Sequence, residues 1–250
     1  MKKNALILSL AIVTLLTACK DEETTSSITN DQAAEMVSMS LAENSMGATA
    51  IVQTSVQTGG STTRSAAPQK VQSVSPDLTF AKDTTFTLTS KPGAIISYSF
   101  TATYGYNFTL NLQGQFTSAT ENYTYSGNYD APRVSSTHTG NGTLALTNMN
   151  TSVVTVNGTF ARTANHTFKG TEALTTNTVV NLNLADILVN KSTATIQSGS
   201  ATLTITGSVP NKGDFSYTGT ITFNGNSMAT LVIQGQSYSV NIKTGEYTAI

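Results

Sequence analysis

The sequence predicts an all-β protein: a strongly curved antiparallel meander, barrel or sandwich of roughly 10–13 strands, preceded by one short N-terminal helix. Apolar and polar residues alternate over many short segments, which is typical of strands with one buried and one solvated face. Asn, Asp, Gly and Pro separate those segments and mark turns. Thr, which favours strands, is abundant after residue 76.

The chain begins with a segment typical of a secretory signal peptide, residues 1–18. Lys2 and Lys3 precede a short apolar stretch, residues 5–16. This stretch is shorter than the about 20 apolar residues that a membrane-spanning helix needs. No later apolar segment approaches that length, so we expect no transmembrane helix in the mature chain.

The single cysteine of the chain, Cys19, follows Leu16-Thr17-Ala18. This arrangement resembles a bacterial lipobox. The resemblance implies cleavage before Cys19, diacylation of its thiol and acylation of the new N-terminus. Stable anchoring takes two or more lipid signals, and triacylation would supply them without a spanning helix. The alternative is a lone cysteine beside an ordinary cleavage site. With one cysteine the chain cannot form an internal disulfide.

The residues after the cysteine carry a second signal. Lys20, Asp21, Glu22 and Glu23 resemble the export signal of Bacteroidota surface lipoproteins. The resemblance implies the outer leaflet of the outer membrane, with the chain facing the medium and the membrane as its partner through the N-terminal lipid. The periplasmic face is the alternative. We assign residues 19–28 to a lipidated acidic tether.

A helix is predicted within residues 29–57. Thr29 and Gln32 have the spacing of a capping box, and Asp31 favours a helix N-terminus. Gly47 is expected to end or loosen the helix. Apolar or small residues share one helical face: Ala33, Met36, Val37, Ser40, Leu41 and Ala48.

Residues 58–76 are rich in Ser, Thr, Gly, Ala and Gln and predict a flexible linker. The antiparallel β domain then spans residues 77–250. Its last strands have apolar residues on one parity, and a change of phase near Gly199 predicts a bulge or a turn. The turns between these strands predict three cross-strand pairs: Val209 with Phe215, Ile221 with Ala229, and Leu231 with Val240.

Glycines recur on the apolar parity of the strands, each between two large residues. Such glycines permit strong coiling of a sheet, and a neighbouring Tyr can cover the bare backbone. A Gly-rich composition alone is the alternative. The glycines are Gly114, Gly127, Gly158, Gly207 and Gly219.

The chain as a whole resembles a group of Bacteroidota surface lipoproteins. The resemblance lies in the lipobox with its acidic tail, the short helix, and the closing strands FSYTGTITFNGNSMATLVIQGQSYSVNI, residues 215–242. It covers most of the chain and implies no particular activity.

Charged residues give little sign of catalysis. The formal net charge is −1 and the sequence shows no basic stripe, so we expect no nucleic-acid partner. A glycosidase needs two carboxyl groups about 5–10 Å apart. Two candidate pairs are Glu121 with Asp130 and Glu172 with Asp186, and we expect these acids to lie in loops without a catalytic role.

The two histidines, His138 and His166, lie among Thr, Asn and Gly. They lack the spacing of a metal site, so we expect surface or turn positions, no metal and no cofactor. Asp83-Thr84-Thr85 resembles the short O-glycosylation sequence of the same bacteria, with Thr84 as the acceptor.

These observations predict a non-catalytic outer-membrane, surface-anchored lipoprotein that acts as a binding or structural module of the envelope. A glycan or an envelope protein is the expected partner of its Thr- and Ser-rich surface. One alternative is a lipocalin-like carrier of a small apolar ligand. The other is a glycoside hydrolase that uses the carboxylates above.

Overall fold

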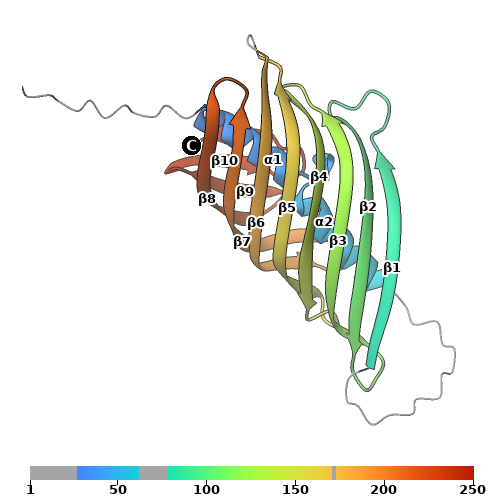
Figure 1. Ribbon diagram of the computed structural model, residues 1–250. Helices are drawn as coiled ribbons and strands as arrows, with labels where there is room; N and C mark the ends of the chain where they lie inside the picture. The colour runs from blue at the N-terminus through green and yellow to red at the C-terminus, as the bar shows by residue number, and fades with distance from the viewer. Residues whose placement is uncertain (1–26, 62–77, 171–172) are drawn as a thin grey trace, which may run out of the picture.

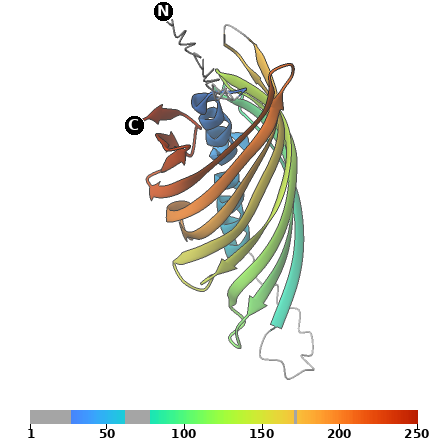
Figure 2. The same ribbon diagram turned by 60° about the vertical axis from the view of Figure 1, so that its left-hand side comes forward.

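The computed structural model describes residues 27–61, 78–170 and 173–250. Eleven antiparallel strands follow one another in chain order in a single sheet, which curves around two helices (Figures 1 and 2). This confirms the predicted all-β curved meander. A pair of helices joined by a 3-10 turn takes the place of the one predicted helix. Strands β1 and β11 are the two edges of the sheet.

The helical elements are α1 (Asn30–Leu41), the 3-10 helix η1 (Glu43–Ser45) and α2 (Ala48–Ser61). The strands are β1 (Leu78–Thr89), β2 (Ser97–Leu110), β3 (Phe116–Asp130), β4 (Val134–Thr147), β5 (Val153–Phe168), β6 (Leu174–Asn190), β7 (Thr195–Val209), β8 (Gly213–Gly225), β9 (Met228–Ile233), β10 (Gln236–Asn241) and β11 (Tyr247–Ala249). None of the described helices is long and apolar enough to cross a membrane.

The predicted capping box begins α1. The main-chain nitrogen of Gln32 donates to Thr29 Oγ1 at 3.2 Å, and the main-chain nitrogen of Thr29 donates to Gln32 Oε1 at 2.9 Å. The helix ends at Leu41, and Gly47 lies just before α2. A Cβ atom on Gly47 would lie 2.4 Å from the main-chain carbon of Leu41, so only glycine allows the chain to fold back this tightly.

The second helix runs further than the sequence indicated. Because α2 continues to Ser61, residues 58–61 of the predicted linker are helical. The rest of that linker lies outside the described residues. The sheet begins at Leu78, beside the predicted domain boundary at residue 77.

Both helices lie on the concave face of the sheet (Figure 2) and share one hydrophobic core with it. Every residue of α1 from Ala33 to Leu41 is buried, including Glu35, Ser38 and Ser40. Helix α2 contributes Ile51, Val52 and Val56 to the same core. The two helices therefore form part of the hydrophobic core of the β domain, and burial of apolar surface stabilises their position.

The predicted cross-strand pairs have the right parity but the wrong register. Val209 lies opposite Gly213, Ile221 opposite Leu231, and Leu231 opposite Tyr238, each displaced by two residues from the prediction. A shift of two residues keeps every side chain on its own face. The predicted faces are accordingly confirmed, since Ile221, Leu231 and Val240 are all buried.

The turn between β8 and β9 explains one of these displacements. It is a two-residue turn at Asn226 and Ser227, both with positive φ, as a type I′ turn requires. In an unbroken ladder, a two-residue turn would put Leu231 on the exposed face. A register shift between Phe223 and Gly225 restores the buried parity beyond the turn.

The predicted change of phase near Gly199 is a bulge. Ala185 pairs with Ser200 and Leu188 with Ser198, so two residues of β6 lie opposite Gly199 alone. Gly199 has a φ of +134°, which favours glycine. In a second shift beside it, Leu188 pairs with Ser198 and Val189 with Ile196, so Gln197 is an extra residue of β7, and the buried positions of β7 change from even to odd numbers.

At most glycines of the predicted series, a neighbouring side chain or main chain lies too close to the glycine Cα to leave room for a Cβ atom. A Cβ atom at Gly127 would lie 2.5 Å from the ring of Phe100, and one at Gly207 would lie 2.5 Å from the ring of Phe215. The covering ring is thus Phe at these two sites, where the prediction was Tyr. Gly114 does not belong to the series, because it lies in the turn between β2 and β3.

Candidate functional site

The predicted N-terminal sites, Cys19 and Lys20, Asp21, Glu22 and Glu23, lie outside the described residues. Thr84 is described. It lies half-buried on the edge strand β1, opposite Tyr104 of β2. Its glycosylation stays a prediction.

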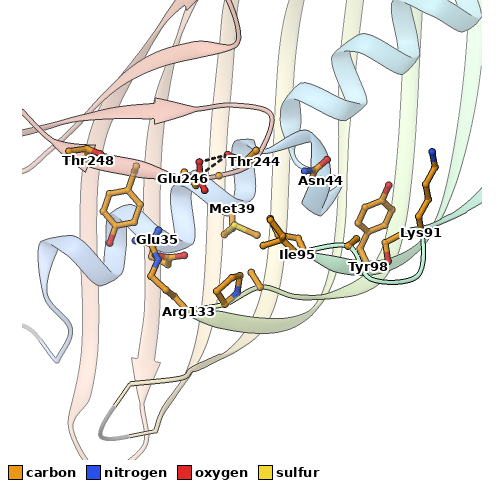
Figure 3. A pocket seen from close by; sticks show the side chains of 17 residues that line it. Glu35, Met39, Asn44, Lys91, Ile95, Tyr98, Arg133, Thr244, Glu246 and Thr248 are labelled. Carbon is orange, nitrogen blue, oxygen red and sulfur yellow. Dashed lines mark hydrogen bonds and ion pairs between the residues drawn. The ribbon is translucent and has the colours of Figure 1, made fainter.

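A pocket of about 750 Å³ lies over α1, where the two ends of the curved sheet approach each other (Figure 3). The segment from the end of β1 to the start of β2, with Lys91, Ile95 and Tyr98, forms one wall. Residues 244–248, which lead into β11, form the opposite wall, and Met39 of α1 lies between them. The volume is within the range of about 300–1,000 Å³ found for small-molecule sites.

An ion pair fixes α1 to the rim of this pocket. Arg133, in the turn between β3 and β4, places its Nε 2.8 Å from Glu35 Oε2. Its guanidinium also lies over the ring of Tyr247 at 4.6 Å, and the Tyr247 hydroxyl donates to the main-chain oxygen of Asp31 at 2.9 Å. Burial raises the pKa of Glu35, and the charge of Arg133 partly opposes this effect.

Two further charges lie at the pocket without an opposite charge beside them. Among the described residues, Lys91 and Glu246 make no ion pair, and the Glu246 carboxylate accepts a hydrogen bond from Thr244 Oγ1 at 3.4 Å. Figure 3 shows Lys91 and Glu246 on opposite sides of the pocket, with Asn44 and Ile95 between them. The pocket therefore has two cations and two anions, Glu35 and Arg133 being already paired.

The position of α1 beneath the pocket depends on Arg162 of β5, which is fully buried. Its Nη1 donates to the main-chain oxygen of Met39 at 3.0 Å, and Nη2 donates to those of Ser45 and Met46 at 2.8 and 2.7 Å. Its Nε donates to the Tyr125 hydroxyl at 3.1 Å. The guanidinium supplies donors to the Ser45 and Met46 carbonyl groups at the break between the helices, and it shares the Met39 carbonyl with the Ser45 hydroxyl.

The prediction that the histidines lie at the surface is wrong. His138 of β4 and His166 of β5 are 4% and 0% exposed on the concave face. Burial, assisted by the charge of Arg162, lowers the pKa of His138 to about 2 and that of His166 to about 3. Both are on the even parity of the buried residues around them, which is the signal that the sequence offered.

The histidines are not gathered with other ligands. His166 Nδ1 lies 3.4 Å from the hydroxyl of Tyr129, and His138 lies among aromatic rings. Within the described ranges, no group of three or more His, Cys, Asp or Glu side chains is placed to hold a metal ion.

Glu121 is also buried in the core, on β3 beneath α2, and not in a loop. It is 1% exposed, and burial raises the pKa of its carboxyl to about 8. Ser55 Oγ lies 2.9 Å from Glu121 Oε1 and 2.7 Å from the main-chain oxygen of Ile51. A hydroxyl has a single proton, so a protonated Glu121 that donates to Ser55 allows both contacts to be hydrogen bonds.

The first candidate glycosidase pair is separated by the strand that carries both residues. Asp130 follows Glu121 by nine positions on β3, which corresponds to about 30 Å at the rise of an extended strand. Asp130 is exposed and pairs with Lys169 at the surface. In the second pair, Glu172 lies outside the described residues and Asp186 is exposed at the β6 bulge.

The concave face offers no support for a lipocalin-like carrier. There α1 and α2 occupy the space in which a barrel of that kind holds its ligand (Figure 2). The pocket over α1 lies instead at the opening between the sheet edges.

Comparison of the chain with family models, with curated proteins and with solved structures finds no match. A function for the pocket is therefore inferred from its own residues.

Proposed function

We propose that the protein is a non-catalytic lipoprotein, anchored in the outer membrane through lipid on Cys19 and displayed at the cell surface, whose β domain binds a ligand in the pocket over α1. The resemblance of residues 16–19 to a lipobox, and that of the acidic residues after them to a surface-export signal, support the anchor and its location. The single observation that carries the binding role is a ligand-sized pocket held by fixed elements: α1, the β3–β4 turn and β11.

The chemistry of the pocket favours binding over catalysis. Glu35 and Arg133 neutralise each other, and Arg133 also stacks on Tyr247. Glu121, His138 and His166, whose pKa values burial shifts strongly, lie in the core and do not line the pocket. A general acid or base must reach its substrate within hydrogen-bond distance, and these groups cannot do so without displacement of a helix.

The proposed anchor at Cys19 precedes α1, the helix beneath the pocket, by only a short stretch of sequence. The tether, residues 19–28, spans at most about 35 Å when fully extended. Helix α1 then brings Glu35 and Met39 to the pocket within about 15 Å of its first turn. A ligand would thus be held within about 50 Å of the membrane.

Intact-mass analysis of the mature protein from a Gram-negative host with lipoprotein export tests the anchor. The expected mass corresponds to a chain that begins at Cys19 and carries acyl groups, and Cys19→Ala is expected to keep its signal segment and lack lipid. An unmodified thiol at Cys19 would overturn the anchor.

Protease treatment of intact cells tests display at the surface. We expect degradation of the wild-type chain and protection of a variant in which Lys20, Asp21, Glu22 and Glu23 are all changed to Ala. That variant is expected to keep its lipid, which separates targeting from anchoring. Equal protection of both chains would place the protein on the periplasmic face.

A further inference from the structure

We propose that the pocket over α1 takes a short peptide with free termini and an apolar side chain. This inference rests on the proposed function of the pocket as a binding site. It combines three features of the described residues: unpaired charges of opposite sign on facing walls, an exposed apolar surface between them, and a free strand edge along one wall.

The charges suit a ligand that is itself dipolar. Lys91 on one wall would pair with the peptide carboxylate, and Glu246 on the other with its ammonium group (Figure 3). Glu35 and Arg133 neutralise each other and add no net charge. A ligand with a single charge would leave either Lys91 or Glu246 without a partner, whereas a ligand with both termini free uses both.

The surface between the two charges is apolar. Ile95 is 83% exposed at the pocket, although isoleucine is usually buried. Met39 contributes a thioether side chain, which adapts to irregular apolar shapes. An apolar side chain of the ligand would cover Ile95 and contact Met39, and the hydrophobic effect would favour that burial.

The free edge of β11 favours a peptide over other zwitterions. Strand β11 pairs with β10 on one side only and is the last strand of the sheet, and residues 246–248 line the pocket. Its outer edge presents main-chain groups to which an extended peptide can hydrogen-bond as an added strand. The side chain of Asn44 lies nearby as a further amide partner.

Two other ligand classes fit less well. A fatty acyl chain would have to lie among the side chains of Lys91, Glu246, Glu35 and Arg133, which would lose hydration without gaining a partner. A sugar ring usually stacks on an open aromatic face, but Arg133 covers one face of Tyr247, and Tyr98 stacks on Phe100 at 4.9 Å.

Calorimetric titration of the mature protein with leucine-containing tripeptides tests the proposal. One tripeptide has free termini, one is N-acetylated and one is C-amidated. We expect binding of the free tripeptide, weakened about three- to tenfold by either blocking group, since each removes one charge pair at a partly exposed site.

Two substitutions assign the termini. Lys91→Met should weaken the free and N-acetylated peptides by a similar factor and leave the C-amidated peptide unchanged. Glu246→Gln should weaken the free and C-amidated peptides and leave the N-acetylated one unchanged. Lys243→Met and Asp214→Asn change exposed charges that do not line the pocket, and they are expected to leave all three affinities unchanged.

The outcomes separate this inference from the proposed function. Equal affinity for free and blocked tripeptides, or equal effects of Lys91→Met and Lys243→Met, would overturn the peptide assignment. Binding of a disaccharide or a fatty acid, but of no tripeptide, would overturn the assignment and keep the pocket as a binding site. Absence of binding to all three classes would overturn both.

Discussion

The Nη2 atom of Arg162 lies 2.7 Å from the main-chain oxygen of Met46, and this contact joins the middle of the sheet to the break between the helices. The cation has no carboxylate partner in the described structure. Three carbonyl groups and the Tyr125 hydroxyl accept its hydrogen bonds, and carbonyl dipoles at the end of a helix favour a positive charge. Arg162 therefore fixes the position of α1, and with it the floor of the pocket.

Arg162→Met is expected to lower the free energy of unfolding by about 3–5 kcal/mol, because it leaves buried carbonyl groups without donors. Denaturant unfolding of both chains measures the difference. Lys169→Met is the control, because it also removes a cation, but from the surface pair with Asp130, and it is expected to cost less than about 1 kcal/mol. Equal losses in the two variants would contradict the structural role of Arg162.

Glu121 should make the protein less stable as the pH rises. Its pKa is raised from 4.5 to about 8, so the folded chain keeps a proton that the unfolded chain loses near pH 4.5. The stabilisation is complete below pH 4.5 and is lost as the pH rises through 8.

The comparison of wild type with Glu121→Gln isolates this effect. The stability of the variant relative to wild type is expected to increase by roughly 3–5 kcal/mol between pH 4.5 and pH 8.5. Unfolding by denaturant at several pH values measures it. The exposed Glu43→Gln is the control, with a change below about 1 kcal/mol. A difference between wild type and Glu121→Gln that does not vary with pH would show that Glu121 is ionised in the fold.

His138 should make the protein less stable as the pH falls, the opposite of the effect of Glu121. Its pKa is lowered from 6.5 to about 2, so the unfolded chain binds a proton below pH 6.5 and the folded chain does not. Stability is therefore lost as the pH falls below 6.5.

His138→Phe replaces the imidazole in a cluster with Phe100, Tyr125 and Tyr129. Relative to wild type, the variant is expected to gain about 2–3 kcal/mol between pH 7 and pH 4.5. The pH dependence is the readout, because any packing cost of Phe is the same at both values. Parallel curves for the two chains would mean that His138 is accessible to protons in the fold.

Gly140 of β4 lies under the ring of Tyr125. A Cβ atom there would lie 2.2 Å from Tyr125 Cζ, and displacement of that ring would also disturb its hydrogen bond from Arg162. Gly140→Ala is expected to cost about 2–4 kcal/mol of unfolding free energy, measured with denaturant. At Gly170 a Cβ atom would meet nothing within 4 Å, so Gly170→Ala is the control, with an expected change below about 0.5 kcal/mol. A tolerated Gly140→Ala would mean that the ring is free to move.

Much of the candidate site could not be predicted, because its residues come from distant parts of the sequence. Four segments that are far apart in the sequence supply Met39, Lys91, Arg133 and Glu246, and the curvature of the sheet brings them together. Local sequence patterns do not predict which distant residues become neighbours in the folded chain. Glu121 and the histidines were also missed, although their parity placed them with the buried residues, because polar residue types argue for exposure.

The sequence by itself determined which side of each strand is buried and where the first helix begins. Alternation with a period of two and the Thr29–Gln32 capping box are local properties, so they hold in any compact arrangement of the chain.

Only the tertiary structure decided the register of the last strands, the place of α1 and α2 inside the curve of the sheet, and the burial of Arg162. A shift of two residues in strand register leaves the alternation of apolar and polar residues unchanged. The alternation also does not show which face of the sheet the helices cover. These choices depend on the free energy of packing the whole core, which distant parts of the chain contribute together.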